Sequence, residues 1–141
     1  MTERSAITIT RVYDAPREAV WRAWTEPEQI AAWWGKRGWS TPVDSVELDV
    51  RPGGTIKLDS IEDDSGESMP LSAIFLEVEP PSRLTFGRID RSDESVVTFT
   101  DLGDGRTEMT FVATVDMSEE LRERAIGGLN SAFDRLAETL T

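Results

Sequence analysis

Carboxylates, arginines and tryptophans are the side chains through which this 141-residue chain could do chemistry, because it contains neither histidine nor cysteine. A Ser-His-Asp triad, a Cys-His pair and zinc sites built on histidine or cysteine are therefore excluded. Acid/base catalysis would fall to carboxylates, Tyr13, Arg88 or water. A buried carboxylate with a raised pKa can act as a general acid or base, and Glu77 is the first candidate for that role.

Arg88 shares the strand register of Leu84 and Phe86, which are predicted to face the interior. In that register its guanidinium would pair with a carboxylate, either Glu77 on the neighbouring strand or an acid on a ligand. The alternative is an arginine at the edge of the sheet whose side chain reaches solvent. The sequence leaves both arrangements open.

An acidic cluster lies between Asp59 and Glu67. Carboxylate oxygens are the ligands that hard cations prefer, but the spacing fits no calcium loop, so a solvated turn is the interpretation we adopt. Gly53-Gly54 is followed by neither a helix nor a Lys-Ser/Thr pair, so it is predicted to be a turn and not a phosphate cradle. We expect no metal and no cofactor.

All five tryptophans lie between Trp21 and Trp39. Trp21 and Trp24 are interpreted as helix-packing residues. Trp33 and Trp34 are adjacent, so they point about 100° apart on a helix and cannot share one face. One of them is therefore a candidate for the mouth of a pocket, while the other is a candidate for contact with a partner.

The charge balance argues against two classes of partner. Lys and Arg number 15 against 27 Asp and Glu, which gives a net charge of −12. A field of this sign repels phosphate backbones and anionic membrane surfaces, so we expect no binding to nucleic acid or membrane. No apolar run approaches the ~20 residues of a membrane span, and no secretory pattern opens the chain. Together with the lack of cysteine, this favours a cytoplasmic location.

Hydrophobic periodicity predicts β-α-α, then antiparallel strands, then a long helix, with no linker or internal repeat. A strand is predicted over residues 6–13. A first helix follows it, with Pro16 at its first position. A second helix begins at a Thr25–Glu28 capping box and ends at Gly35. Strand patterns start at Val43 and continue over residues 55–61, 69–79, 83–89, 96–102 and 107–115. The last helix is predicted to begin after an N-cap at Ser118.

One face of the last helix repeats with helical spacing and is predicted to pack on the sheet. Its residues are Leu121, Ala125, Leu129, Ala132, Phe133, Leu136 and Leu140.

The order and spacing of several short motifs resemble those of a known family. The motifs are Ala15-Pro16 with Val20-Trp21, Trp24-Thr25 with Pro27-Glu28, Trp33-Trp34, Arg51-Pro52-Gly53-Gly54, Glu77-Val78 with Pro80-Pro81 and Arg83-Leu84, Gly105 with Thr107, and Arg135-Leu136. Over nearly the whole chain, they are similar to bacterial relatives of the activator of the ninety-kilodalton heat-shock protein ATPase, within the START-like (SRPBCC) superfamily. The chain is therefore expected to be one START-like domain over residues 1–141.

The resemblance implies an α+β helix-grip fold, in which a curved antiparallel sheet packs around a long C-terminal helix and two short helices follow the first strand. Combined with strand alternation, it places an inward-facing set on the sheet and helix: Ile56, Leu58, Leu71, Ala73, Phe75, Leu84, Phe86, Val97, Phe99, Met109, Phe111, Ala113, Leu129, Ala132 and Phe133. These residues either fill a core or leave a cavity between sheet and helix. The candidate ligand-binding residues are Trp33, Trp34, Ile56, Leu58, Phe75, Phe86, Arg88, Phe99, Met109, Phe111, Leu129 and Phe133.

Two positions depart from the family pattern and bear on the shape of a cavity. Ala73 stands where the family usually has Gly, and Leu129 stands where an aromatic residue, commonly Trp, follows a Gly. Gly127 and Gly128 precede Leu129 inside the helix, where each costs roughly 1 kcal/mol relative to Ala. That cost is explained if a side chain there would collide with a strand or a ligand.

Three functions fit these observations. The first is binding of a small hydrophobic or aromatic molecule in the cavity, since such sites are mostly apolar. The second is a cyclase- or hydrolase-like enzyme that uses carboxylates in the same cavity. The third is a chaperone-interacting domain, as the family name implies. The ligand is not specified by the sequence, and a homodimer is left open.

The absence of imidazole and thiolate ligands predicts that the purified protein retains no transition metal. Elemental analysis should find zinc and copper well below one equivalent per chain. Stoichiometric zinc or copper after dialysis would contradict this prediction.

Overall fold

The computed structural model describes residues 5–88, 93–115 and 118–140, whose strands form one eight-stranded antiparallel sheet. The strands are β1 (Ser5–Tyr13), β2 (Trp39–Ser40), β3 (Glu47–Leu48), β4 (Thr55–Glu62), β5 (Ser68–Glu79), β6 (Arg83–Gly87), β7 (Glu94–Asp101) and β8 (Thr107–Val115). The helices are α1 (Arg17–Thr25), α2 (Pro27–Trp33), the 3₁₀ turn η1 (Val43–Ser45) and α3 (Glu119–Thr139). The order across the sheet is β1-β8-β7-β6-β5-β4-β2, and β3 also pairs with β4.

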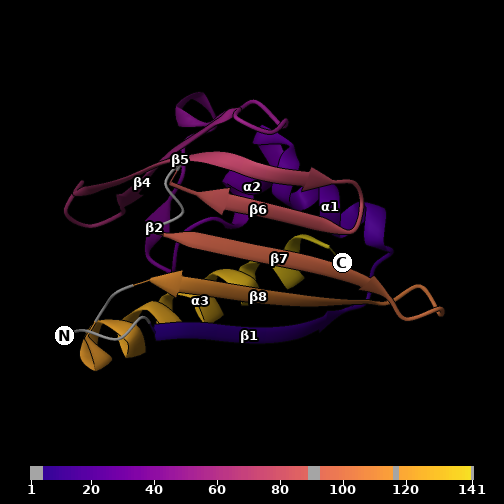
Figure 1. Cartoon of the computed structure of the whole chain (residues 1–141). Helices are drawn as coiled ribbons and strands as arrows, with labels where there is room; N and C mark the ends of the chain where they lie inside the picture. Colours follow the sequence, from indigo (N-terminus) through magenta and orange to yellow (C-terminus); the bar gives the residue numbers. More distant parts are fainter. Residues whose placement is uncertain (1–4, 89–92, 116–117, 141) are drawn as a thin grey trace.

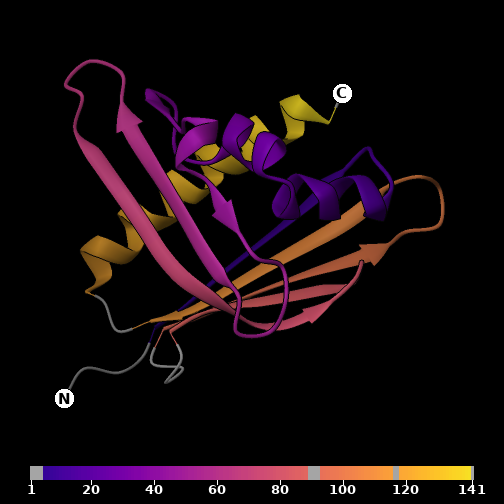
Figure 2. The same ribbon diagram turned by 90° about the horizontal axis from the view of Figure 1, so that it is seen from above.

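The sheet is strongly curved, and all three α-helices lie on its concave side (Figure 1). Seen from above, α3 crosses that side diagonally while α1 and α2 cover its remaining part (Figure 2). This arrangement confirms the predicted helix-grip fold.

The core lies between the concave face and the helices, and strand alternation combined with the family resemblance predicted most of it. The buried members of the predicted inward set are Ile56, Leu58, Phe75, Leu84, Val97, Phe99, Met109, Phe111, Ala113, Ala132 and Phe133. The remaining members pack against this core half-buried: Leu71, Ala73, Phe86 and Leu129. The pleat of each strand places alternate residues on the same face.

The predicted capping box at the start of α2 is wrong. The Thr25 hydroxyl donates to the carbonyl oxygen of Trp21 (2.9 Å) and so belongs to the end of α1. Glu26 is the N-cap of α2 and makes no side-chain capping bond, while Pro27 takes the first helical position. Pro16 likewise precedes α1 as its N-cap and is not its first residue. At both helix starts, the fixed φ of proline marks the boundary.

Shorter elements also differ from the prediction. The stretch at Val43 is a 3₁₀ turn followed by the two-residue strand β3, and β2 was not predicted. Two residues are too few to show a period of two, so such strands leave no pattern in a sequence. The predicted strand end at Ile89 lies outside the described residues, and so does the part of the following loop that precedes Asp93.

Ser118 caps α3 as predicted, and its hydroxyl accepts a hydrogen bond from the backbone N–H of Leu121 (3.2 Å). The predicted apolar face is not buried evenly. Ala132 and Phe133 are buried, whereas Leu121 is 53% exposed. The first turns of α3 extend beyond the start of β1, so the sheet does not cover them (Figure 1).

The structure contradicts one of the two predicted reasons for the glycines in α3, a collision with a strand. A Cβ added to Gly127 or Gly128 would meet nothing within 4 Å, neither strand nor side chain. Close packing therefore does not explain these glycines, and nothing else in the structure does.

We predict that Gly128→Ala raises the free energy of unfolding by about 1 kcal/mol, because Ala costs less backbone entropy than Gly inside a helix and has open space here. Gly127→Ala should behave in the same way. Gly54→Ala is the control, since its Cβ would collide with the carbonyl oxygen of Asp49 and should destabilise the fold. Urea unfolding monitored by circular dichroism measures all three, and a loss of stability in both α3 variants would contradict the prediction.

Candidate functional site

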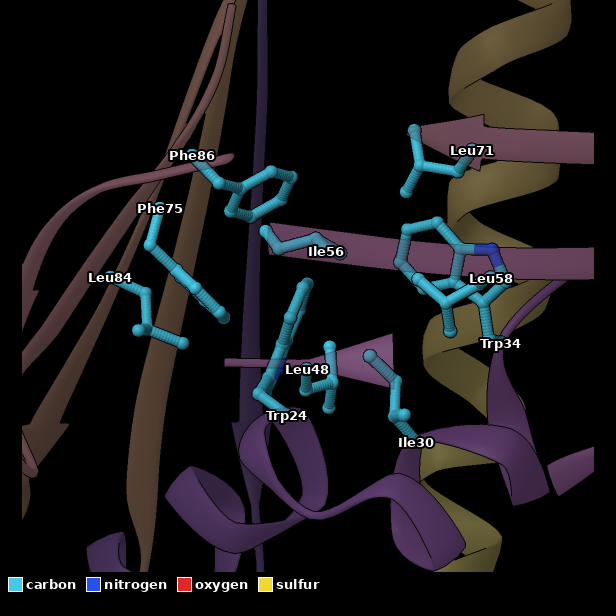
Figure 3. Close-up of a pocket in the computed structure, with 10 residues that line it drawn as sticks. All are labelled: Trp24, Ile30, Trp34, Leu48, Ile56, Leu58, Leu71, Phe75, Leu84 and Phe86. Carbon is cyan, nitrogen blue, oxygen red and sulfur yellow. The ribbon is translucent and has the colours of Figure 1, made fainter. Parts of the chain in front are cut away.

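An apolar pocket lies between helices α1 and α2 and the part of the sheet made by β3 to β6 (Figure 3). Ten residues line it: Trp24, Ile30, Trp34, Leu48, Ile56, Leu58, Leu71, Phe75, Leu84 and Phe86. None of them carries a charge. The pocket is thus suited to an apolar ligand, and none of its lining side chains would hold an ion.

The pocket is nearly closed in this structure. The space that a water-sized sphere can occupy is about 10 Å³, which is room for about one water molecule. Four lining residues are half-buried and form its outer wall: Trp34, Leu48, Leu71 and Phe86. A ligand larger than water would enter only if this outer wall moved.

Trp24 lies at the centre of an aromatic cluster beside the pocket. Its ring centroid is 4.8 Å from that of Trp33 and 6.4 Å from that of Trp34. It also lies 6.1 Å from Phe86 on β6 and 6.4 Å from Phe111 on β8, with the latter pair nearly parallel at 18°. Edge-to-face and offset contacts at such distances add to simple burial. Trp24 therefore ties α1 to α2 and to the sheet.

The two adjacent tryptophans take different roles. Trp33 is 0% exposed, and its indole N–H donates to the carbonyl oxygen of Ala23 (2.9 Å), which fastens α2 to α1. Trp34 follows the last residue of α2, is half-buried and lines the pocket. Of the pair, Trp34 holds the position expected for a residue at the pocket mouth.

Arg135 on α3 fixes the backbone that carries Trp34. Its guanidinium donates to the carbonyl oxygens of Gly35 (2.8 Å) and Trp39 (3.0 Å). Its other terminal nitrogen lies 3.4 Å from the Ala32 carbonyl oxygen, near the end of α2. A cation at a helix C-terminus is also favoured by the helix dipole. Arg135 thereby satisfies carbonyls in a segment that has little regular structure.

The hydroxyl of Thr41 holds the same segment from the sheet side. It donates to the Trp34 carbonyl oxygen (3.0 Å) and lies 3.1 Å from the Ser60 hydroxyl on β4. The outer wall at Trp34 is thus tied to α3 through backbone carbonyls that accept from Arg135, and to β4 through the hydroxyls of Thr41 and Ser60.

The structure brings together some of the predicted ligand-binding residues. Those that line the pocket are Trp34, Ile56, Leu58, Phe75 and Phe86. Those that do not are Trp33, Phe99, Met109, Phe111 and Phe133, which are buried in the core, the half-buried Leu129, and Arg88. No residue of α3 lines this pocket, so it lies between the sheet and the two short helices and not against the C-terminal helix.

Arg88 does not point into the interior. Its side chain is exposed, just beyond the last residue of β6. The carboxylate considered as its partner, Glu77, instead forms an ion pair with Arg83 (3.2 Å). Of the two arrangements left open by the sequence, the solvent-reaching one is correct.

Five lining residues were not among the predicted ligand-binding residues: Trp24, Ile30, Leu48, Leu71 and Leu84. Of these, Leu71 and Leu84 were predicted only to face inward. Ile30 lies four residues before Trp34, so helical spacing alone could have placed it beside that residue. Trp24 was interpreted only as a packing residue, although it both packs against neighbouring aromatic rings and lines the pocket. Leu48 lies in a two-residue strand, which is too short to show a strand pattern in the sequence.

The candidate acid/base groups are not in the pocket. The Glu77 side chain is 38% exposed and pairs with Arg83. Burial raises the pKa of Tyr13 above its usual value, and its hydroxyl donates to the carbonyl oxygen of Phe133 (3.2 Å). Tyr13 therefore stays protonated at neutral pH and is unsuited to act as a base. Among the described residues, no group of three or more acidic side chains is placed to hold a metal ion.

Comparison with known proteins identifies relatives of the whole fold. A family model described as activator of Hsp90 ATPase homolog 1-like protein matches residues 14–141. No protein with a curated description matches the chain. None of the helices in the described parts of the chain is long and apolar enough to cross a membrane.

Several solved bacterial structures resemble the chain over nearly its full length. A Nitrosomonas europaea protein is 26% identical, with a TM-score of 0.82 and coverage of 96% of this chain and 93% of that one. An AHSA1-like protein from Aeromonas hydrophila is 25% identical, with a TM-score of 0.80 and coverage of 97% and 96%. The AHSA1 protein from Silicibacter pomeroyi, at 19% identity, shares the fold with a TM-score of 0.82 and coverage of 96% and 97%.

We predict that Arg135→Met destabilises the protein by about 1.5–3 kcal/mol, because it leaves carbonyl oxygens near the end of α2 without a charged donor. Arg37→Met is the matched control, since the Arg37 side chain forms an exposed ion pair with Glu138 and its loss should change stability little. Urea unfolding of both variants compares them. Equal stability of the two would show that Arg135 does not fix this segment.

Proposed function

The chain belongs to the family of proteins like activator of Hsp90 ATPase homolog 1, and we propose that it binds a small apolar molecule in the pocket beside Trp24 and Trp34. The observation that supports this most directly is the lining, which consists of ten apolar side chains and no charged one. Binding sites for small molecules are concave and mostly apolar in this way.

The present small volume corresponds to a closed form of the site. A one-ring ligand needs far more space than about 10 Å³, so the outer wall at Trp34 and Leu71 must move outward when the ligand enters. Both residues are half-buried, and movement toward solvent breaks fewer packing contacts than movement of the buried Leu84 or Phe75. The free energy of binding would then include the cost of moving the outer wall outward.

The expected affinity follows from the size of such a ligand. An aromatic ring of about 150–250 Å² buried at roughly 25 cal/mol per Å² gains on the order of 4–6 kcal/mol. Before the opening cost, this corresponds to a dissociation constant between about 1 mM and tens of micromolar. Larger ligands would bind more tightly only if the wall opened further.

The two alternative functions have less support. An enzyme using carboxylates in this pocket lacks a carboxylate there, since Glu77 pairs with Arg83 elsewhere. A protein-interaction role for Trp33 conflicts with its complete burial. A ligand carrier or sensor is therefore the function we favour, in a cytoplasmic setting.

We predict that α-methylstyrene, a one-ring apolar probe, shifts the amide and methyl NMR resonances of the pocket residues in a saturable manner. Leu71→Phe should weaken this binding at least about tenfold, because the larger ring fills the outer wall of the pocket. Leu129→Phe is the control, since it makes the same change at a half-buried leucine outside the pocket. Equal loss in both variants, or no saturable shift in the native protein, would contradict the proposed site.

A further inference from the structure

The indole N–H of Trp24 has no hydrogen-bond partner among the described residues. The side chain is 3% exposed and its Nε1 atom is buried. The neighbouring Trp33 differs, since its Nε1 donates to the Ala23 carbonyl oxygen (2.9 Å). Trp24 is thus a pocket-lining residue with an unused donor.

Such a donor is unusual in a folded interior. Most buried N–H groups are paired, and an unpaired one loses its bond to water without gaining another. The ring of Trp24 projects from α1 into the middle of the lining residues, between Phe75 and Leu48 (Figure 3). We therefore take the pocket as the route by which an acceptor from outside the described chain reaches this donor.

We propose that the ligand carries one hydrogen-bond acceptor on an otherwise apolar body, and that this acceptor takes the Trp24 indole N–H. This inference rests on the proposed function and specifies the chemical class of the ligand as a neutral ketone, aldehyde, ester or ether.

Other polar classes fit the pocket less well. No lining side chain carries a positive charge and the chain has a net charge of −12, so a carboxylate ligand would lose its hydration without compensation. An amine or alcohol would bring an N–H or O–H for which no lining side chain offers an oxygen. A ligand group that only accepts hydrogen bonds therefore suits a lining whose polar side-chain atoms, the indole N–H groups, can only donate them.

Two probes of nearly equal shape test this proposal. Acetophenone carries a C=O group where α-methylstyrene carries C=CH₂, so the pair differs chiefly in the acceptor. Because water also solvates the ketone, the informative quantity is the ratio of the two dissociation constants, compared between the native protein and Trp24→Phe. We expect the relative preference for acetophenone to fall about three- to tenfold in Trp24→Phe, as for loss of one neutral hydrogen bond.

Trp34→Phe provides the matched control, because Trp34 is the other tryptophan that lines the pocket. It should weaken the binding of both probes similarly and leave their ratio unchanged. In the native protein, the indole ¹H resonance of Trp24 should also move downfield with acetophenone but not with α-methylstyrene. This second readout decides the matter if Trp24→Phe does not fold.

The outcomes separate this inference from the proposed function. Suppose that both probes bind but that the ratio of their dissociation constants is the same in the native protein and in Trp24→Phe. The proposed function is then supported, and the acceptor proposal is overturned. If the ratio changes in Trp34→Phe instead, the donor is Trp34 and the proposal is again wrong. If neither probe shifts any pocket resonance in a saturable manner, both the proposed function and this inference fail.

Discussion

The packing of Trp24 is the interaction on which the rest of the structure depends. From α1 it contacts rings on two helices and two strands: Trp33 of α2, Phe133 of α3, Phe86 of β6 and Phe111 of β8. An aromatic side chain is large and buries much area in a core. Its position therefore sets how closely the short helices approach the sheet, and the pocket lies where that approach is incomplete.

A second, polar constraint sets the other side of the pocket. After α2 the chain forms only two-residue strands and a 3₁₀ turn before β4, so few of its carbonyls are satisfied by long ladders. Arg135 and Thr41 provide donors for several of them. The position of Trp34 thus depends on α3 even though no α3 side chain lines the pocket. A buried carbonyl must find a donor, and here the donors come from distant elements.

The sequence predicted the architecture better than the site, for a physical reason. Long strands and α3 bury one face each, and that constraint appears as a period of two or 3.6 that can be recognised locally. The pocket occupies only part of the inward face, however. Phe99 and Phe111 face inward as predicted, but Trp21 and Phe133 cover them. Which inward residues stay uncovered depends on helix placement, which alternation does not encode. For Arg88 the sequence left two arrangements open, because the predicted strand was extended past Gly87, where the strand ends.

The two constraints divide the pocket into a rigid and a compliant side. Trp24, Phe75 and Leu84 form the rigid side, since each is at most 3% exposed and belongs to a long strand or to the aromatic cluster. The side chains of Leu48 and Trp34 form the compliant side, because they are half-buried and can move toward solvent while Arg135 and Thr41 hold the backbone at Trp34 in place. Displacing the rigid side would open the core, whereas displacing the compliant side exchanges a few contacts for solvent. A ligand that reached Trp24 would thus pass between Trp34 and the first half of β5.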